Sequence, residues 1–185
     1  MNRGKSIRYI AGAAGVLLIA FLVILAMAKP GESESASSPL LGNPAPVVKS
    51  TTLGGGSFDL SHRKGSWVVL NFFNSTCVPC RQEHPLLIDF VKEQKTSDNA
   101  VELYTVVNDD SDGAVQAFFD TNGGDWPVVR DDDGAISVAF GVAKVPESWV
   151  IDPNGFVRLR IMGGLTKGFL TTRLNELKTQ FAGGQ

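Results

Sequence analysis

The sequence has little cysteine and little histidine, with two residues of each among its 185. Both cysteines, Cys77 and Cys80, lie in the stretch "TCVPCRQEHP". Position 81 is Arg, so the C-x-x-C-H pattern of covalent haem attachment is absent and this chemistry is excluded. No histidine follows His84, so the chain has no later histidine to complete a copper site with the two cysteines.

The sequence also lacks an excess of positive charge. Its formal net charge is −2, from 17 basic and 19 acidic residues. Three of the basic residues precede position 10, so the rest of the chain is more acidic than the total suggests. A nucleic-acid-binding protein would need a basic face, and we therefore expect no nucleic-acid partner.

One long apolar segment lies near the N-terminus. Residues 10–28, "IAGAAGVLLIAFLVILAMA", carry no charge, and a helix needs about 20 residues to cross a bilayer. The basic residues that precede this run predict a cytoplasmic N-terminus, with everything after position 29 on the extracytoplasmic side. We therefore expect 1–28 to be a single-pass membrane anchor. A cleaved signal peptide ending at "AMA" is the alternative, and it places the folded part on the same side.

The rest of the chain divides into a linker and one domain. Residues 29–43 are rich in Ser, Pro, Gly and Glu, which predicts a flexible tether. The domain is expected at 44–182. It begins with a hairpin turning at 54–56, and a buried strand follows in "SWVVLNFF". Further along, "DPNG" predicts the turn of a second hairpin, and a helix closes the chain.

Between the first buried strand and the second hairpin, helices are expected at about 78–96 and in "DDSDGAVQAFFDTNG", with another buried strand in "AVELYTVVN". The order after the first hairpin is β-α-β-α-β-β-α, with parallel strands first and a hairpin last. It predicts an α/β thioredoxin-like fold, a mixed central sheet flanked by helices, with an added N-terminal hairpin.

The two cysteines fall where this fold joins a buried strand to a helix. Helix N-termini carry unpaired N–H groups and partial positive charge, which stabilise a thiolate. Thiols in such places have pKa values of about 3.5–7.5 instead of about 8.5. Cys77, nearer the strand, is expected to be the exposed attacking thiol, and Cys80, inside the first turn, the resolving thiol.

Two other interpretations of this pair stay open. A structural disulfide is disfavoured because a loop of four residues constrains little of the unfolded chain. A metal site would use His62, Cys77, Cys80 and His84, two sulfur and two nitrogen ligands. With such a site the protein would be a copper- or zinc-binding thioredoxin-fold metallochaperone. We predict no bound metal, because Cys80 and His84 are one helical turn apart whereas His62 lies in a different segment. His84 is expected on an exposed helix face.

The stretch "VVLNFFNSTCVPCRQEHP" resembles the active-site region of the TlpA/ResA/CcmG group of membrane-anchored thioredoxin-like proteins. The matching residues are Asn71, Phe72, Cys77, Cys80, Glu83 and Pro85. The later stretch "GVAKVPESWVID" is similar to a second motif of the same group. Thr76 and Phe73 depart from the pattern, because the group carries aromatic residues at position 76 and Trp at position 73.

This resemblance implies roles for four residues. Glu83 would exchange a proton with the thiols. Pro146 would follow a cis peptide bond and face the cysteines. Val145 would offer its backbone to an extended substrate, and Glu147 is expected to line the same groove.

The resemblance further implies a thiol-disulfide oxidoreductase with no cofactor beyond the Cys77–Cys80 redox pair. Its expected partners are disulfide-bearing proteins, among them apocytochrome c, and a membrane electron donor of the CcdA/DsbD type. A peroxiredoxin-like peroxidase is the alternative within the same fold. Such enzymes normally keep Thr three residues before the reactive cysteine, where this chain has Asn74.

Overall fold

The computed structural model describes residues 3–27, 34–97 and 99–183. The side chains of residues 3–11, 25–27 and 34 are not described. The chain forms two compact units, 1–31 and 32–185, and each is considered by itself.

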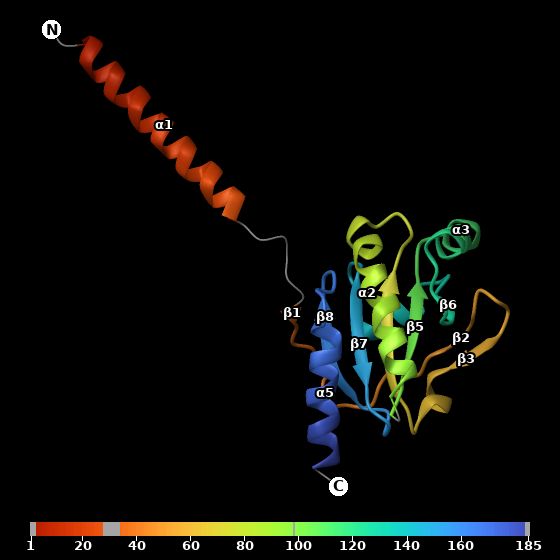
Figure 1. The fold of residues 1–185 in the computed structure, drawn as a ribbon. Helices are drawn as coiled ribbons and strands as arrows, with labels where there is room; N and C mark the ends of the chain where they lie inside the picture. Colours follow the sequence, from red (N-terminus) through yellow and green to blue (C-terminus); the bar gives the residue numbers. More distant parts are fainter. Residues whose placement is uncertain (1–2, 28–33, 98, 184–185) are drawn as a thin grey trace. The chain divides into compact units, whose positions relative to one another are not determined.

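The first unit holds one helix, α1 (Arg3–Met27) (Figure 1). No helix within the described residues is both long enough and apolar enough to span a membrane. The predicted anchor at 1–28 lies partly outside the described residues, as does part of the predicted linker at 29–43.

The second unit is built on a six-stranded mixed sheet in the order β1-β8-β7-β4-β5-β6. Strands β4 (Trp67–Phe73), β5 (Val101–Val107) and β6 (Val128–Arg130) are parallel. Strand β7 (Glu147–Ile151) runs antiparallel to β4, and β8 (Val157–Met162) runs antiparallel to β7. The predicted hairpin is present as β2 (Lys49–Thr51) and β3 (Ser57–Asp59), followed by the short helix η1 (Leu60–Arg63).

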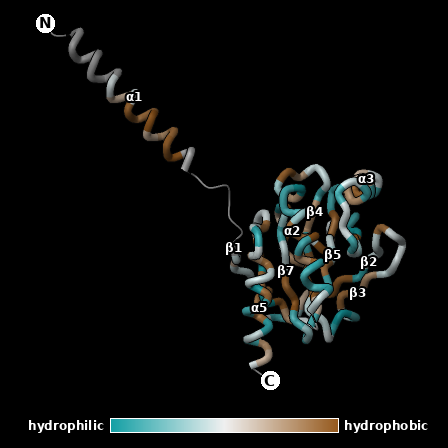
Figure 2. Tube along the Cα trace, in the orientation of Figure 1, coloured by the Kyte–Doolittle hydropathy of each residue, from teal (hydrophilic) through white to brown (hydrophobic). Residues whose placement is uncertain are grey.

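Helices cover both faces of this sheet. One face packs on α2 (Val78–Lys95) and α5 (Phe169–Ala182), through Leu87, Phe90, Leu170 and Leu174. Helix α3 (Asp112–Asn122) adds an aromatic cluster beside α2, and α4 (Ala135–Phe140) packs on the opposite face with the hairpin. All seven residues of β4 are buried, so the continuous apolar run marks the central strand as expected. Figure 2 shows the hydrophobic residues that run along β5 and β7.

Part of the predicted linker contacts the sheet. Strand β1 (Glu34–Ser35) pairs with the edge of β8. Ala36 N donates to Arg160 O at 2.9 Å, and Gly42 N donates to Val157 O at 2.8 Å. The ordered domain therefore begins about ten residues earlier than position 44. These contacts use backbone groups of an edge strand, which place few demands on side-chain type.

Candidate active site

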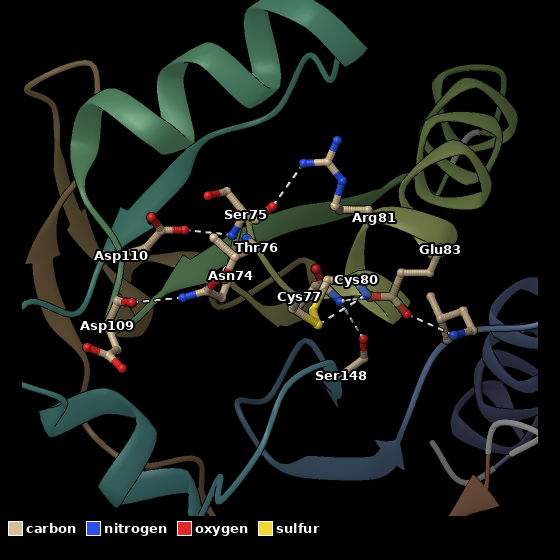
Figure 3. Close-up of a disulfide and its surroundings, with 12 residues drawn as sticks. Asn74, Ser75, Thr76, Cys77, Cys80, Arg81, Glu83, Asp109, Asp110 and Ser148 are labelled. Carbon is tan, nitrogen blue, oxygen red and sulfur yellow. Dashed lines mark hydrogen bonds between the residues drawn. A yellow bond between two sulfur atoms is a disulfide. The ribbon is translucent and has the colours of Figure 1, made fainter.

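The two cysteines lie where β4 gives way to α2, as the sequence predicted. They form a disulfide, and Cys77 is the N-cap of α2, its Sγ accepting from Cys80 N at 3.2 Å (Figure 3). Cys80 is fully buried, whereas Cys77 is partly exposed beside the exposed Val78 and Pro79. Of the two cysteines, Cys77 is therefore the one that a second molecule can approach. The Cys80 N–H at the start of α2 points toward Cys77 Sγ and, with the partial positive charge of the helix N-terminus, would stabilise its thiolate after reduction.

Polar contacts hold the loop that leads into Cys77. Asn74 Oδ1 accepts from Thr76 N at 2.9 Å and from Thr76 Oγ1 at 2.6 Å, and Asn74 Nδ2 donates to Asp109 O at 2.8 Å. Ser75 N donates to Asp110 Oδ2 at 2.6 Å. On the other side, Arg81 Nη1 donates to Ser75 O at 3.1 Å. The loop is thus tied to the segment after β5 and to its own helix, which fixes the backbone just before the attacking sulfur.

Glu83 lies one turn beyond Cys80 and is buried, with 1% of its surface exposed. Its Oε1 accepts from Asn71 Nδ2 and its Oε2 from Leu165 N, both at 2.8 Å. Burial raises the pKa of Glu83 from its usual 4.5 to about 7, although both hydrogen bonds favour the charged form. A carboxyl group with this pKa is suited to take up and release a proton near neutral pH.

Asn71 is a part of the site to which sequence reasoning gave no role. It sits fully buried at the centre of β4 and donates to Ser148 Oγ at 3.1 Å as well as to Glu83. Its Oδ1 has no hydrogen-bond partner among the described residues. A buried polar side chain in an otherwise apolar strand was the available signal, because such a group needs a partner.

The Val145–Pro146 peptide bond is cis, as the resemblance implied. Val145 is half-buried and packs on the same hydrophobic cluster as Cys77. The loop after β8 connects this bond to the helix. Gly163 N donates to Pro146 O at 3.0 Å, and a Cβ at Gly164 would lie 3.7 Å from Pro79. The structure therefore brings together all five predicted site residues: Cys77, Cys80, Glu83, Val145 and Pro146.

Two other expectations were wrong. His84 is 2% exposed instead of lying on an exposed face, and its Nε2 lies 2.8 Å from Gly123 O within a ring of aromatic side chains from α3 and Trp126. Glu147 does not line an open groove, because it is 1% exposed and forms an ion pair with Arg160.

The histidines and cysteines do not gather into a metal site. His62 lies on η1 with an exposed side chain, 3.8 Å from Asp59, while His84 is enclosed by aromatic rings. Among the described residues, no group of three or more His, Cys, Asp or Glu side chains could hold a metal ion.

Comparison with known proteins agrees with this geometry. A model of the AhpC/TSA family matches residues 41–160. The chain is 31% identical over 137 residues to the thiol-disulfide oxidoreductase ResA of Bacillus subtilis, covering 74% of this chain and 75% of ResA. It is 33% identical over 141 residues to the thiol:disulfide interchange protein HelX of Rhodobacter capsulatus, covering 75% of this chain and 77% of HelX.

A solved structure points the same way. The crystal structure of a thiol:disulfide interchange protein DsbE from Chlorobium tepidum matches with a TM-score of 0.62 at 27% identity, covering 76% of this chain and 94% of that one. The fold, the disulfide at the helix cap and these matches agree. The chain therefore belongs to the AhpC/TSA family, as a thioredoxin-like thiol-disulfide oxidoreductase of the ResA and HelX type.

Proposed function

We propose that this oxidoreductase reduces disulfides in proteins on the extracytoplasmic side of a membrane. The Cys77 thiolate attacks a substrate disulfide, which forms a mixed disulfide and releases one substrate thiolate. The Cys80 thiolate then attacks Cys77 Sγ, which releases the second substrate thiolate and leaves the Cys77–Cys80 disulfide. Glu83 takes up the proton that Cys80 loses, and the released substrate thiolates are protonated.

The observation that carries this proposal is the unequal exposure of the two joined cysteines. Cys77 caps α2 and is partly open, and Cys80 is fully buried one turn above Glu83. Such a pair admits a substrate to one sulfur and keeps the other for resolution. The cycle uses only this redox pair and calls for no further cofactor.

We also propose the partners of this cycle. Val145 packs on the same hydrophobic cluster as Cys77, and its backbone would receive an extended peptide through main-chain hydrogen bonds. The substrates are therefore disulfide-bearing proteins with an extended segment around the disulfide, and the haem-site cysteines of apocytochrome c have this form. A membrane electron donor of the CcdA/DsbD type would return two electrons to the Cys77–Cys80 disulfide after each turnover.

The proposed location rests on the N-terminal sequence. Residues 10–28 carry no charge, and the basic residues before them favour a cytoplasmic N-terminus. A membrane-impermeant maleimide should label Cys77 of the Cys80→Ser variant in intact cells. Labelling that appears only after lysis would contradict the location and leave the chemistry standing.

Trapping tests the chemistry. The Cys80→Ser variant should accumulate mixed disulfides through Cys77 in native membranes, because the resolving thiol is missing. Non-reducing electrophoresis and mass spectrometry would show the adducts and identify the substrate. Cys77→Ser is the matched control and should trap nothing. More adducts in Cys77→Ser than in Cys80→Ser would reverse the assigned roles, and none in either variant would refute the function.

A peroxiredoxin-like peroxidase is the second candidate, because the matching family model is that of AhpC/TSA. Asn74 holds the position that Thr occupies in such enzymes, and its side chain is engaged with Thr76 and Asp109. Turnover of hydrogen peroxide by the reduced protein, without a disulfide substrate, would favour the peroxidase.

A further inference from the structure

Arg160 on β8 forms a buried ion pair next to the cis-proline. Its Nε donates to Glu147 Oε1 at 2.9 Å and its Nη2 to Glu147 Oε2 at 3.1 Å, a bidentate arrangement. The side chains are 16% and 1% exposed. Glu147 follows Pro146 directly, so this pair fixes the backbone at the downstream end of the cis peptide bond.

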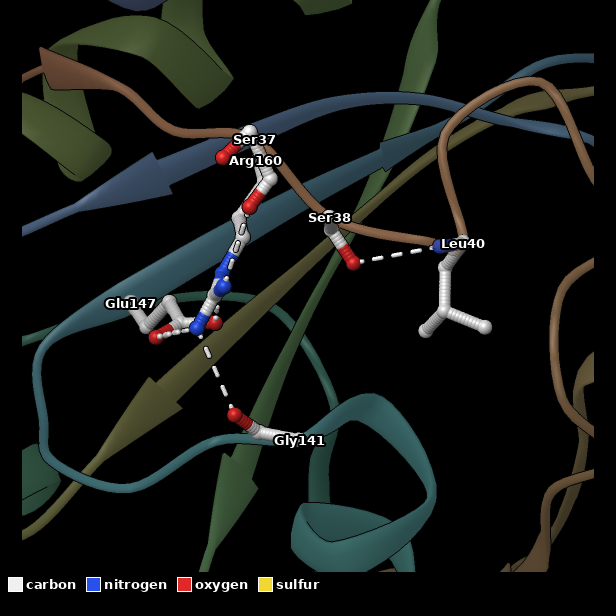
Figure 4. A network of polar contacts seen from close by, with 6 residues as sticks. All are labelled: Ser37, Ser38, Leu40, Gly141, Glu147 and Arg160. Atoms are coloured by element: carbon white, nitrogen blue, oxygen red, sulfur yellow. Dashed lines mark hydrogen bonds and ion pairs between the residues drawn. The ribbon is translucent and has the colours of Figure 1, made fainter.

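The same guanidinium reaches the upstream end of the segment that carries this bond. Arg160 Nη2 also donates to Gly141 O at 3.3 Å (Figure 4). Gly141 is the C-cap of α4, where its φ of 67° ends the helix. One side chain therefore joins the two ends of 141–147, the stretch that contains Val145 and Pro146.

The remaining guanidinium nitrogen of Arg160, Nη1, contacts the N-terminal part of the domain. Its Nη1 donates to Ser37 O at 3.3 Å, and its own carbonyl accepts from Ala36 N at 2.9 Å. The guanidinium carbon lies 5.2 Å from the centre of the Trp149 ring, which limits the rotation of the side chain. The planar fork of Arg suits three separate acceptors, whereas Lys would offer a single point of charge.

Little else anchors the segment between its two ends. Val142 N donates to Ser137 O at 2.8 Å, and the buried Pro146 accepts from Gly163 N at 3.0 Å. Val142 and Val145 pack partly against the core, whereas Ala143 and Lys144 are exposed, so the stretch just before the cis bond depends on what holds its ends. Strand addition by a substrate needs a backbone that is already in position, because ordering it on binding would reduce affinity.

We propose that Arg160 is a positioning residue that holds 141–147 in the conformation that receives an extended substrate. This rests on the proposed function, in which Val145 presents its backbone beside Cys77. Arg160 does not touch the reacting sulfurs, so it should affect the binding of extended substrates and leave the reactivity of Cys77 unchanged.

The experiment compares two Arg residues of the same strand in the full chain. Arg158 also pairs with a buried carboxylate, its Nε lying 2.6 Å from Asp152 Oδ2, beside the turn at the other end of β8. Arg158→Met is therefore the matched control for Arg160→Met. Each reduced variant is assayed with a disulfide-bonded peptide that has extended flanks, and with 5,5′-dithiobis(2-nitrobenzoate), a small disulfide without a peptide backbone.

For Arg160→Met we expect the KM for the peptide to rise about tenfold to a hundredfold, the scale of misplaced positioning groups. Its rate with the small disulfide should stay within about twofold of wild type. The KM of Arg160→Lys for the peptide should lie between those of wild type and Arg160→Met, because Lys keeps the positive charge and lacks the planar guanidinium. The proposal is overturned if Arg160→Met and Arg158→Met have the same KM for the peptide. It is also overturned if Arg160→Met loses activity equally with the peptide and with the small disulfide.

Hydrogen exchange separates this proposal from the function on which it rests. The amides of 142–145 and of Glu147 should exchange faster in Arg160→Met than in Arg158→Met, while those of 80–83 stay unchanged. If wild type reduces no peptide, the proposed function fails, and this comparison still decides whether Arg160 holds the segment. Equal exchange rates of these amides in the two variants would refute the proposal that Arg160 holds 141–147 in position.

Discussion

Replacing Glu83 by Gln should remove a defined part of the pH dependence of stability. Glu83 is neutral at low pH in both folded and unfolded chains. As the pH rises, the unfolded chain releases this proton near the usual pKa of 4.5, whereas the folded chain keeps it until about 7. Between these two pKa values the ionisation of Glu83 stabilises the unfolded state and not the folded state, so the free energy of unfolding falls as the pH rises.

The size of this effect follows from the same two values. Moving the pKa of Glu83 from 4.5 to about 7 corresponds to about 3 kcal/mol, at about 1.36 kcal/mol for each pKa unit. The Glu83 contribution should be complete below about pH 4.5 and lost above about pH 7. The Gln variant has no titrating group here, and Asn71 Oδ1, which lacks a partner among the described residues, is an acceptor available to the new amide.

The assay is denaturant unfolding of the oxidised protein, followed by tryptophan fluorescence from the buried Trp67 and Trp149. The disulfide stays closed, so neither cysteine titrates. The difference in the free energy of unfolding between Glu83→Gln and wild type should change by about 3 kcal/mol between about pH 4.5 and about pH 8. Glu93→Gln, an exposed change on the same helix, controls for the loss of one negative charge. If the free energy of unfolding of wild type and of Glu83→Gln changes with pH in the same way, burial does not hold the proton on Glu83.

Three further changes test other contacts. Asn71→Leu removes a donor to Glu83 and should raise the pKa of that group above about 7, so the pH-dependent fall in stability moves to higher pH; an unchanged midpoint would exclude this coupling. Asp131→Ala removes the acceptor of Ile136 N, Ser137 N and Ser137 Oγ at the start of α4, and should cost about 1–3 kcal/mol in the free energy of unfolding. Leu174→Ala, at a position 0% exposed between α5 and the sheet, should cost about 2–5 kcal/mol, and a loss well below about 1 kcal/mol would contradict the packing.

The sequence predicted those parts of the fold that leave a local pattern. The apolar run of β4, the turn before β8 and the paired cysteines are each contained within a few neighbouring residues. The docking of 34–43 on β8 has no such pattern, because its hydrogen bonds to β8, from backbone groups and from the Arg160 side chain, join residues more than 100 positions apart. His84 was misplaced for a similar reason: the aromatic side chains of α3 that enclose it come from a separate segment.

The same distinction applies within the site. Cys77, Cys80 and Glu83 are set by spacing along one helix, which a sequence displays. The groups that hold them in place come from elsewhere in the chain. Ser148 reaches Asn71 across 77 positions, and Leu165 reaches Glu83 across 82. Such contacts depend on strand register, and register is decided by the whole sheet.

The two departures from the family pattern acquire a physical meaning in the structure. Phe73 is buried against Phe118 and Phe119, so it fills the core of the site and does not face a substrate. Thr76 is exposed, and both its N–H and its hydroxyl donate to Asn74 Oδ1. The loop before Cys77 is therefore held by hydrogen bonds, where an aromatic side chain would hold it by packing. An exposed aromatic surface would favour apolar substrate segments, whereas this polar loop offers hydrogen-bonding groups beside the reactive sulfur. Replacing Thr76 by Trp should therefore shift selectivity among disulfide substrates toward apolar segments, and an unchanged ranking of substrates would exclude a role for the loop 74–76.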